Sequence, residues 1–248
     1  MKILLNISYD GTNYFGWQRQ KNAISVQQIV EEKLSMLFSR QIKIIGASRT
    51  DAKVHALAQK AMFNLDNSTF KIPIEKIPLV INKMLPDDIV ITNAKIVDDN
   101  FHARYDVFSK TYRYTILNSD FLIPQYRNYC WHIKNTLDLQ IICDAVKFFI
   151  GTKDFASFCA SGSSQKSTIR TIYDFHADFK NKFIIFEISA NGFLYNMVRI
   201  IIATVIQAAE KKITLSDIEK IIAAKKRSFA SKTAPPQGLT LTNIIYKE

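Results

Sequence analysis

Short strand-like segments alternate with longer amphipathic segments along the chain, and this alternation limits the possible fold more than any other feature of the sequence. Runs rich in β-branched and apolar residues predict strands at 2–9, 42–45, 56–63, 88–97, 110–117, 168–179, 183–190 and 239–246. Apolar residues at helical spacing predict helices at 26–38, 73–85, 137–150, 193–209 and 216–224. The first helix has a start signal, because Ser25 and Gln28 form a capping-box pattern. This order of elements is typical of α/β or α+β proteins.

The second half of the chain repeats the order of elements of the first, although no sequence identity between the halves is evident. The length of 248 residues suits one large domain or two modest ones, since domains commonly contain ~100–200 residues. We therefore predict two similar lobes, an N-terminal lobe at 1–105 and a C-terminal lobe at 106–248.

The charge balance favours a polyanionic partner. The chain has 33 Lys and Arg against 22 Asp and Glu, a formal net charge of +11, and such an excess is typical of nucleic-acid-binding proteins. A Lys-rich proteome would produce the same balance.

Three cysteines without a Cys-x-x-Cys pair predict free thiols and a cytoplasmic location. The most apolar window, 193–209, is interrupted by polar residues and is shorter than the ~20 apolar residues of a membrane span, so no membrane association is expected.

One carboxylate and one guanidinium lie in a short polar loop between two apolar runs of the first lobe. Asp51 follows Arg49 by two residues. A neighbouring arginine lowers the pKa of a carboxylate and keeps it ionised, which suits a nucleophile or a base. Glycosidases with paired carboxylates need a second, protonated acid, and none is nearby in the sequence. The alternative is a surface loop with a weak, exposed ion pair.

A single arginine interrupts the apolar helix predicted at 193–209. Arg199 lies in a run that is apolar nearly all round, which predicts burial of its side chain. A buried charge must be paired, and this helix has no acid before Glu210. We therefore predict that Arg199 reaches across to Asp51. The alternative is that its guanidinium extends out to solvent.

The common metal and nucleotide motifs are absent from the sequence. The His and Cys residues lack zinc-site spacing, and no phosphate loop, dinucleotide-binding glycine motif or serine-hydrolase elbow occurs. No metal or cofactor is therefore expected. His55, four residues after Asp51, could shuttle a proton, but a structural hydrogen bond is the more common role and is expected here.

Two other segments suit RNA contact, each with a simpler alternative, and a third combines aromatic and basic side chains. Residues 12–20 mix aromatics, amides and an arginine, which suits base stacking or ordinary loop packing. Residues 101–105 place two aromatics, an imidazole and a guanidinium together. Residues 160–167 are rich in Ser and Gly and include Lys166, a composition that could hold phosphates but is more often a linker.

Taken together, the motifs resemble those of the tRNA pseudouridine synthase A family. The matching stretches run in order along nearly the whole chain: Tyr9–Gln20, Gly46–Ala56, Phe101–Arg104, Lys110–Tyr114, Phe155–Phe158, Asn191–Arg199 and Thr233–Leu239. An ordered set of this kind is far more specific than any one motif.

The resemblance implies both an activity and a fold. The family isomerises uridine to pseudouridine at positions 38, 39 and 40 of the tRNA anticodon stem–loop, without metal or cofactor. It acts as a homodimer, with one tRNA lying across both subunits. The implied fold is the α+β pseudouridine synthase fold, in which two similar lobes share an extended, mainly antiparallel sheet with helices on one face and a basic cleft on the other.

The resemblance also implies roles for particular residues. Asp51 is the expected nucleophile, paired with Arg199, while Arg49 helps to evert the base and Tyr112 stacks on it. The carboxylate could attack C1′ or C6 or remove a proton, and the sequence does not choose among these routes. RNA contacts are implied for Phe101, His102, Ala103, Arg104, Tyr105, Gly162, Ser163, Ser164, Gln165 and Lys166.

Two positions depart from the family pattern, and two other functions stay open. Ser48 and Lys53 occupy positions at which the family usually has glycine. If either position needs a positive φ, its residue stores roughly 1–3 kcal/mol of strain. The alternatives to a tRNA isomerase are an RNA-binding module that has lost catalysis and an isomerase of another RNA.

Overall fold

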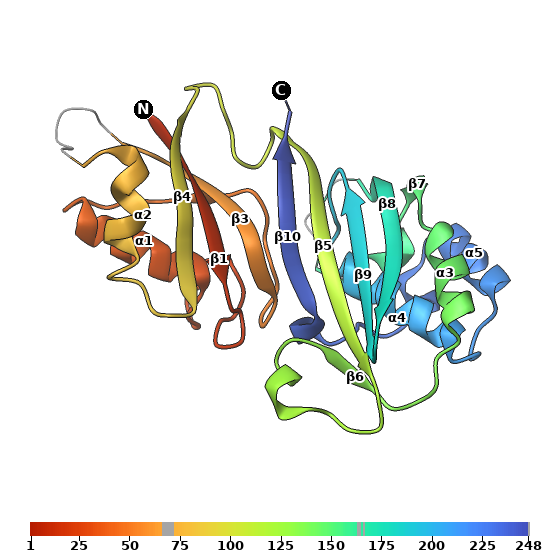
Figure 1. Cartoon of the computed structure of the whole chain (residues 1–248). Coiled ribbons are helices and arrows are strands. Elements are labelled where there is room, and N and C mark those ends of the chain that lie inside the picture. Colours follow the sequence, from red (N-terminus) through yellow and green to blue (C-terminus); the bar gives the residue numbers. More distant parts are fainter. Residues whose placement is uncertain (66–71, 163–164, 166, 248) are drawn as a thin grey trace. The chain divides into compact units, whose positions relative to one another are not determined.

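The computed structural model describes residues 1–65, 72–162, 165 and 167–247 (Figure 1). By its internal contacts the chain divides into two compact units: a first unit of residues 1–108 and 240–248, and a second unit of residues 109–239. The predicted lobes, 1–105 and 106–248, differ from these units because the last strand belongs with the first unit. The lobes as functional divisions stay a prediction.

The sheet of the first unit is mainly antiparallel. β1 lies between β4 and β3 and pairs antiparallel with both, while the start of β10 pairs in parallel with the start of β3 through Thr240↔His55 and Leu241↔Ala56. The C-terminal strand therefore supports the point at which β3 begins. The strands are β1 (Lys2–Tyr9), β2 (Ile45–Gly46), β3 (His55–Asn64), β4 (Ile89–Val97) and β10 (Leu239–Tyr246).

Two helices accompany this sheet. Helix α1 (Val26–Leu37) begins as predicted, since the Ser25 hydroxyl accepts a hydrogen bond from the Gln28 N–H at 3.3 Å. The helix predicted at 73–85 is shorter: a 3₁₀ turn precedes α2 (Ile77–Ile81). Directly after the helix, the side-chain amide of Asn82 pairs with both backbone groups of Ile91 on β4, at 2.9 Å each.

The second unit has its own antiparallel sheet, in the order β5-β9-β8-β7, with β6 beside β5 in parallel. Two of these strands, β6 and β7, were not predicted because each is too short to show a periodic pattern. The strands are β5 (Val107–Asn118), β6 (Trp131–Ile133), β7 (Gly151–Asp154), β8 (Ile169–Lys180) and β9 (Phe183–Ala190).

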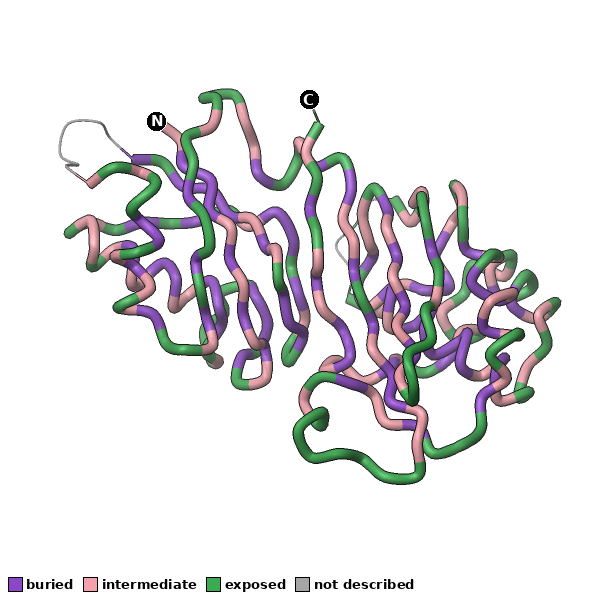
Figure 2. Tube along the Cα trace, in the orientation of Figure 1, coloured by how far each residue is buried: buried purple, intermediate pink, exposed green. Residues whose placement is uncertain are grey.

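The helices of the second unit are α3 (Leu139–Lys147), α4 (Met197–Ala209) and α5 (Leu215–Ala224). Along β9 every second residue is buried, as expected for a strand with one face on the core (Figure 2). Helix α4 is buried on nearly all sides, and of its residues, all of them described, Arg199 and Gln207 alone keep partial exposure.

The predicted α+β class with mainly antiparallel strands is confirmed. The ends of β1, β9 and β10 match the prediction, whereas the strand predicted at 42–45 is wrong, since only Ile45–Gly46 pairs with β3. None of the described helices is long and apolar enough to cross a membrane.

Candidate active site

The predicted catalytic carboxylate lies in the aspartate loop (residues 47–54), which joins β2 to β3. A buried amide of β3 holds the start of this loop. Gln59 has 0% exposure; its Oε1 accepts from the Ser48 N–H at 3.2 Å, and its Nε2 donates to the Ser48 carbonyl at 2.8 Å. One side chain thus hydrogen-bonds both the N–H and the carbonyl of Ser48, as a neighbouring β-strand would.

The middle of the aspartate loop is attached to the segment after β1. The Thr50 hydroxyl lies 2.7 Å from the Tyr9 hydroxyl, and the Thr50 carbonyl accepts from the Trp17 N–H at 3.1 Å. The Lys53 N–H donates to the Tyr14 carbonyl at 3.1 Å. Asp51, which is half-buried, therefore lies between two positions whose backbones are fixed.

Three glycines allow this close packing, because a Cβ at each would collide with the opposing segment. A Cβ at Gly11 would lie 2.1 Å from the Val54 carbonyl oxygen, one at Gly16 would lie 2.5 Å from the Thr50 carbonyl oxygen, and one at Gly46 would lie 2.3 Å from Nε1 of Trp17. Gly16 also has a φ of +89°, which favours glycine. These glycines place the aspartate loop directly against the segment after β1.

Part of the segment 12–20 packs inside the first unit, and RNA contact by its exposed residues stays a prediction. Tyr14 and Trp17 are buried, with 6% and 1% exposure. Arg19 forms an ion pair with Glu31 of α1 at 2.8 Å. Phe15 is the exposed large aromatic of this segment, at 62%.

The two departures from the family pattern have different consequences. Lys53 has a φ of +64°, so it adopts the left-handed conformation that favours glycine. Ser48 is not among the described residues with positive φ. The predicted strain therefore applies to Lys53 and not to Ser48.

His55 has a structural role, as expected. It is 5% exposed at the start of β3, and its Nδ1 accepts from the Gly11 N–H at 3.1 Å and lies 3.1 Å from a carboxylate oxygen of Asp10. These contacts attach β3 to the segment after β1. Arg49 is exposed, and its ion pair with Asp51 stays a prediction.

In the second unit, Arg199 is held at the beginning of α4 by neutral acceptors. Its Nε donates to the Ala234 carbonyl at 2.7 Å, and another guanidinium nitrogen donates to Oδ1 of Asn196 at 2.7 Å. Asn196 adopts a left-handed conformation with a φ of 59° directly before the helix. These bonds orient the guanidinium without neutralising it. Its predicted pairing with Asp51 concerns two different units and stays a prediction.

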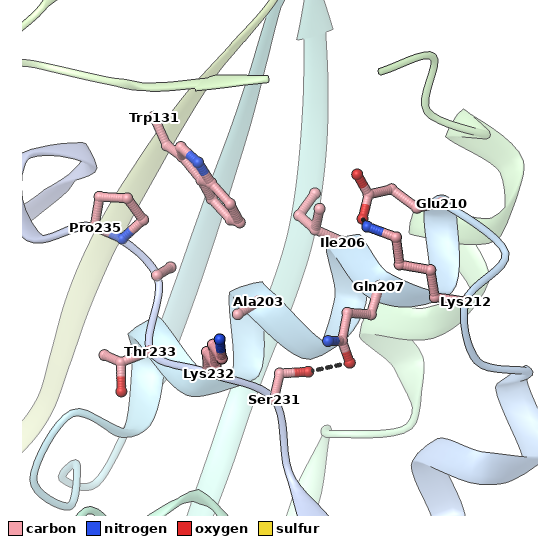
Figure 3. A pocket seen from close by; sticks show the side chains of 11 residues that line it. Trp131, Ala203, Ile206, Gln207, Glu210, Lys212, Ser231, Lys232, Thr233 and Pro235 are labelled. Carbon is pink, nitrogen blue, oxygen red and sulfur yellow. Dashed lines mark hydrogen bonds and ion pairs between the residues drawn. The ribbon is translucent and has the colours of Figure 1, made fainter. Parts of the chain in front are cut away.

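The segment that holds Arg199 is itself anchored within the second unit. The Tyr114 hydroxyl donates to the Pro235 carbonyl at 2.7 Å; burial raises the pKa of Tyr114 far above its usual range, although nearby Arg199 opposes the shift. Ser231 donates to the Gln207 amide at 2.6 Å. The same segment lines a pocket of about 260 Å³ (Figure 3). The remaining walls are Trp131, Ala203, Ile206, Gln207, Glu210 and Lys212.

Tyr112 lies on β5 opposite Ile188 of β9. It has 6% exposure, and its ring packs edge-on against Phe193, with centroids 5.2 Å apart and an interplanar angle of 89°. The ring is therefore held in one orientation by its neighbours. Its stacking on a target base stays a prediction.

The residues predicted to contact RNA differ in their exposure. Ala103 has 0% exposure and packs with Leu4 and Met62, so its side chain supports the turn from inside. Tyr105 is 68% exposed; its ring stacks on His102 at 4.3 Å, and the guanidinium of Arg104 lies 5.9 Å from its centroid. The exposed face of this turn thus combines a cation with two stacked rings.

The remaining predicted contacts are partly outside the described residues. Phe101 packs edge-on against Tyr246, with centroids 4.7 Å apart. Gly162 is exposed with a φ of +83°, and Gln165 accepts from Arg170 at 3.4 Å. Ser163, Ser164 and Lys166 lie outside the described residues. RNA contact by any of these residues stays a prediction.

Sequence reasoning missed Gln59 and Asn196 as residues that position the site. A signal for each was present, since Gln59 is an amide within an apolar strand and Asn196 directly precedes an apolar helix. Within the described part of the chain, no group of three or more His, Cys, Asp or Glu side chains could hold a metal ion.

Comparison with known proteins gives matches over nearly the whole chain. A family described as tRNA pseudouridine synthase matches residues 6–106 and 145–247. A tRNA pseudouridine synthase A of Thermoanaerobacter sp. (strain X514) is 49% identical over 244 residues, covering 98% of this chain and 99% of that protein. Proteins of the same name from Caldicellulosiruptor saccharolyticus and Clostridium acetobutylicum are 45% and 42% identical with the same coverage. A solved Cbf5-Nop10-Gar1 complex is similar over 96% of this chain and 57% of that chain, but its TM-score of 0.34 and identity of 11% are too low to support an argument.

Proposed function

Because the chain belongs to the tRNA pseudouridine synthase family, we propose that it isomerises uridine to pseudouridine at positions 38, 39 and 40 of the tRNA anticodon stem–loop, with Asp51 as the nucleophile. The observation that carries the proposal is the 49% identity to a tRNA pseudouridine synthase A over 98% of this chain. The enzyme is an isomerase, and no cofactor is needed in the proposed reaction.

The proposed reaction breaks the N1–C1′ bond, turns the uracil and joins C5 to C1′, with the C5 proton released to solvent and a proton from solvent taken up at N1. The target base first leaves the helical stack, at a cost of a few kcal/mol. Asp51 attacks C1′ or C6, or removes a proton, and all three routes need an ionised carboxylate held in one place. The bonds of Thr50 to Trp17 and of Lys53 to Tyr14 support this role because they fix the backbone on both sides of Asp51.

Two arginines and one tyrosine complete the proposed site. Arg199 pairs with Asp51 and keeps its carboxylate ionised; its bonds to Ala234 and Asn196 leave the positive charge of the guanidinium in place. Arg49 assists eversion of the base, and Tyr112 provides the stacking surface.

The proposed partner is tRNA, bound by a homodimer in the cytoplasm. The net charge of +11 supports salt-sensitive binding to phosphates. The exposed rings and guanidinium at 102–105 suit stacking on unpaired bases.

The test is release of tritium from tRNA labelled at C5 of uridine. The parent protein should release tritium, and Asp51→Asn should release none, while its affinity for tRNA is retained. Asp144→Asn, which removes a partly exposed carboxylate of α3 that pairs with Lys147, is the matched control and should behave as the parent. Equal release by Asp51→Asn and the parent would exclude the catalytic role, and wild-type activity of Arg199→Met would exclude the proposed ion pair.

The two alternative functions give different results. A parent protein that binds tRNA without releasing tritium would be an RNA-binding module. Mapping of modified nucleotides in RNA from cells lacking the protein would reveal an isomerase of another RNA, since positions 38 to 40 of tRNA would then keep their pseudouridines.

A further inference from the structure

Phe15 presents an aromatic ring to solvent from the segment that packs against the aspartate loop. The ring is 62% exposed, whereas the residues on either side of it, Tyr14 and Gly16, are buried. A single exposed apolar side chain does not by itself identify a site. The position, the rigidity and the charged neighbours of this ring give it a specific role.

The two neighbours of Phe15 contact the aspartate loop close to Asp51. The Tyr14 carbonyl accepts from the Lys53 N–H at 3.1 Å, and a Cβ at Gly16 would lie 3.1 Å from the carbonyl carbon of Asp51. Because consecutive Cα atoms are ~3.8 Å apart, the Cα of Phe15 lies within about 9 Å of the Asp51 backbone. Successive bases of a nucleic-acid strand stack ~3.4 Å apart. The ring can therefore reach a base one or two positions from the nucleotide on which Asp51 acts.

The backbone of Phe15 is held on both sides of its Cα. Its N–H donates to the Ile24 carbonyl at 3.0 Å, and its carbonyl accepts from Nε2 of Gln20 at 2.8 Å. An aromatic side chain has only two rotatable bonds, so it loses little conformational entropy when it binds. The ring is thus a stacking surface that is largely ordered before any ligand arrives.

The charges near the ring favour RNA as its ligand. Arg49 and Lys53 of the aspartate loop are exposed. Surfaces that combine cations with aromatic rings are typical of binding to unpaired nucleic acid, because the cations attract phosphates and the rings stack on bases.

We propose that Phe15 stacks on an unpaired base next to the target uridine and so positions the RNA at Asp51. This inference rests on the proposed function, in which the substrate is the tRNA anticodon stem–loop. The phenyl ring has no hydrogen-bonding group, so it accepts any base. A contact that does not read the base is what modification at three successive positions, 38, 39 and 40, requires.

The first test is the dissociation constant for an anticodon stem–loop RNA, measured by fluorescence anisotropy. Phe15→Ala should weaken binding by about 5- to 150-fold, as expected for the loss of one stacked base, and Phe15→Tyr should bind as the parent. Phe229→Ala is the matched control, because Phe229 is 60% exposed and belongs to the second unit; it should also bind as the parent. Thermal unfolding checks that all variants fold.

The second test locates the stacked base. Stem–loops carry 2-aminopurine on one side or the other of the target uridine, and Asp51→Asn is the background protein, so that the RNA stays unmodified. At saturating protein, the fluorescence at one of these two positions should be lower with Phe15 than after Phe15→Ala, because stacking quenches 2-aminopurine. A purely structural role of Phe15 would not produce this difference.

Three results would overturn the proposal: parental affinity of Phe15→Ala, an equal loss of affinity in Phe229→Ala, or bound fluorescence that is independent of Phe15 at both positions. Weak binding by Phe15→Tyr would exclude stacking as the source of the affinity. Tritium release is measured in parallel. A parent that needs Phe15 for binding but releases no tritium would keep the contact and remove the proposed function, whereas full release and parental affinity in Phe15→Ala would do the reverse.

Discussion

Replacing Gly16 by alanine would place a methyl group 2.5 Å from the carbonyl oxygen of Thr50, the residue before Asp51. Ordinary contacts of a Cβ begin at 3.4 Å, so one segment must move by about 0.9 Å. Misplacement of a catalytic group by ~1 Å can lower the rate by about 100-fold. We therefore expect Gly16→Ala to lower kcat by about 100-fold with little change in KM. The φ of +89° adds about 1–2 kcal/mol of strain to the folded state.

Single-turnover tritium release measures the rate, and urea unfolding measures the stability. Gly151→Ala is the matched control: its φ is +97°, but the nearest atom to an added Cβ is Nζ of Lys153 at 4.0 Å. It should lose stability through the backbone strain and keep the parental kcat. If Gly16→Ala turned over as fast as Gly151→Ala, the aspartate loop would not depend on this close approach, and the reasoning would be refuted.

Three other substitutions test the structure. Gln59→Leu should lower the free energy of unfolding by about 2–4 kcal/mol because it strands two buried backbone groups; a loss below about 1 kcal/mol in urea would contradict the bonds described. Lys53→Gly should raise that free energy by up to about 1 kcal/mol, since relief of left-handed strain exceeds the added chain entropy; a lower urea midpoint would count against it. Asp217 has a pKa well below its usual value because of hydrogen bonds from Lys220 and Thr214, so its stabilisation is present above about pH 4, the unfolded pKa, and is lost as the pH falls further. Asp217→Asn should therefore unfold at lower urea than the parent at pH 7, and the gap should close in acid; a gap that persists there would exclude the carboxylate as its source.

Local pattern was enough to locate most of the elements. Strands β1, β9 and β10 begin and end where the periodicity predicted, because alternation over eight residues is a property of each segment by itself. Contacts between segments that are distant in the sequence were not predicted. Asn82, directly after α2, bonds both backbone groups of Ile91 on β4, and nothing within residues 73–85 reveals that partner.

In the candidate site, too, some features were predictable from the sequence and others depended on distant contacts. Asp51, Arg49, Arg199 and Tyr112 were predicted from residue type and from the family motifs, since a charge in an apolar helix and an acid two residues after an arginine are visible in the sequence; their roles stay predictions. The burial of Ala103 was not visible, because it depends on packing against Leu4 and Met62 from other strands.

The sequence by itself determined the α+β class, the order of elements and the family, because these depend on periodicity and on motifs within short segments. The tertiary structure decided how the aspartate loop is held and which unit receives the last strand. The partners in those contacts are far apart in the chain: Tyr9 and Thr50 are separated by 41 residues, and β10 reaches β3 from the other end. Such contacts form only when the chain folds, so no local pattern encodes them.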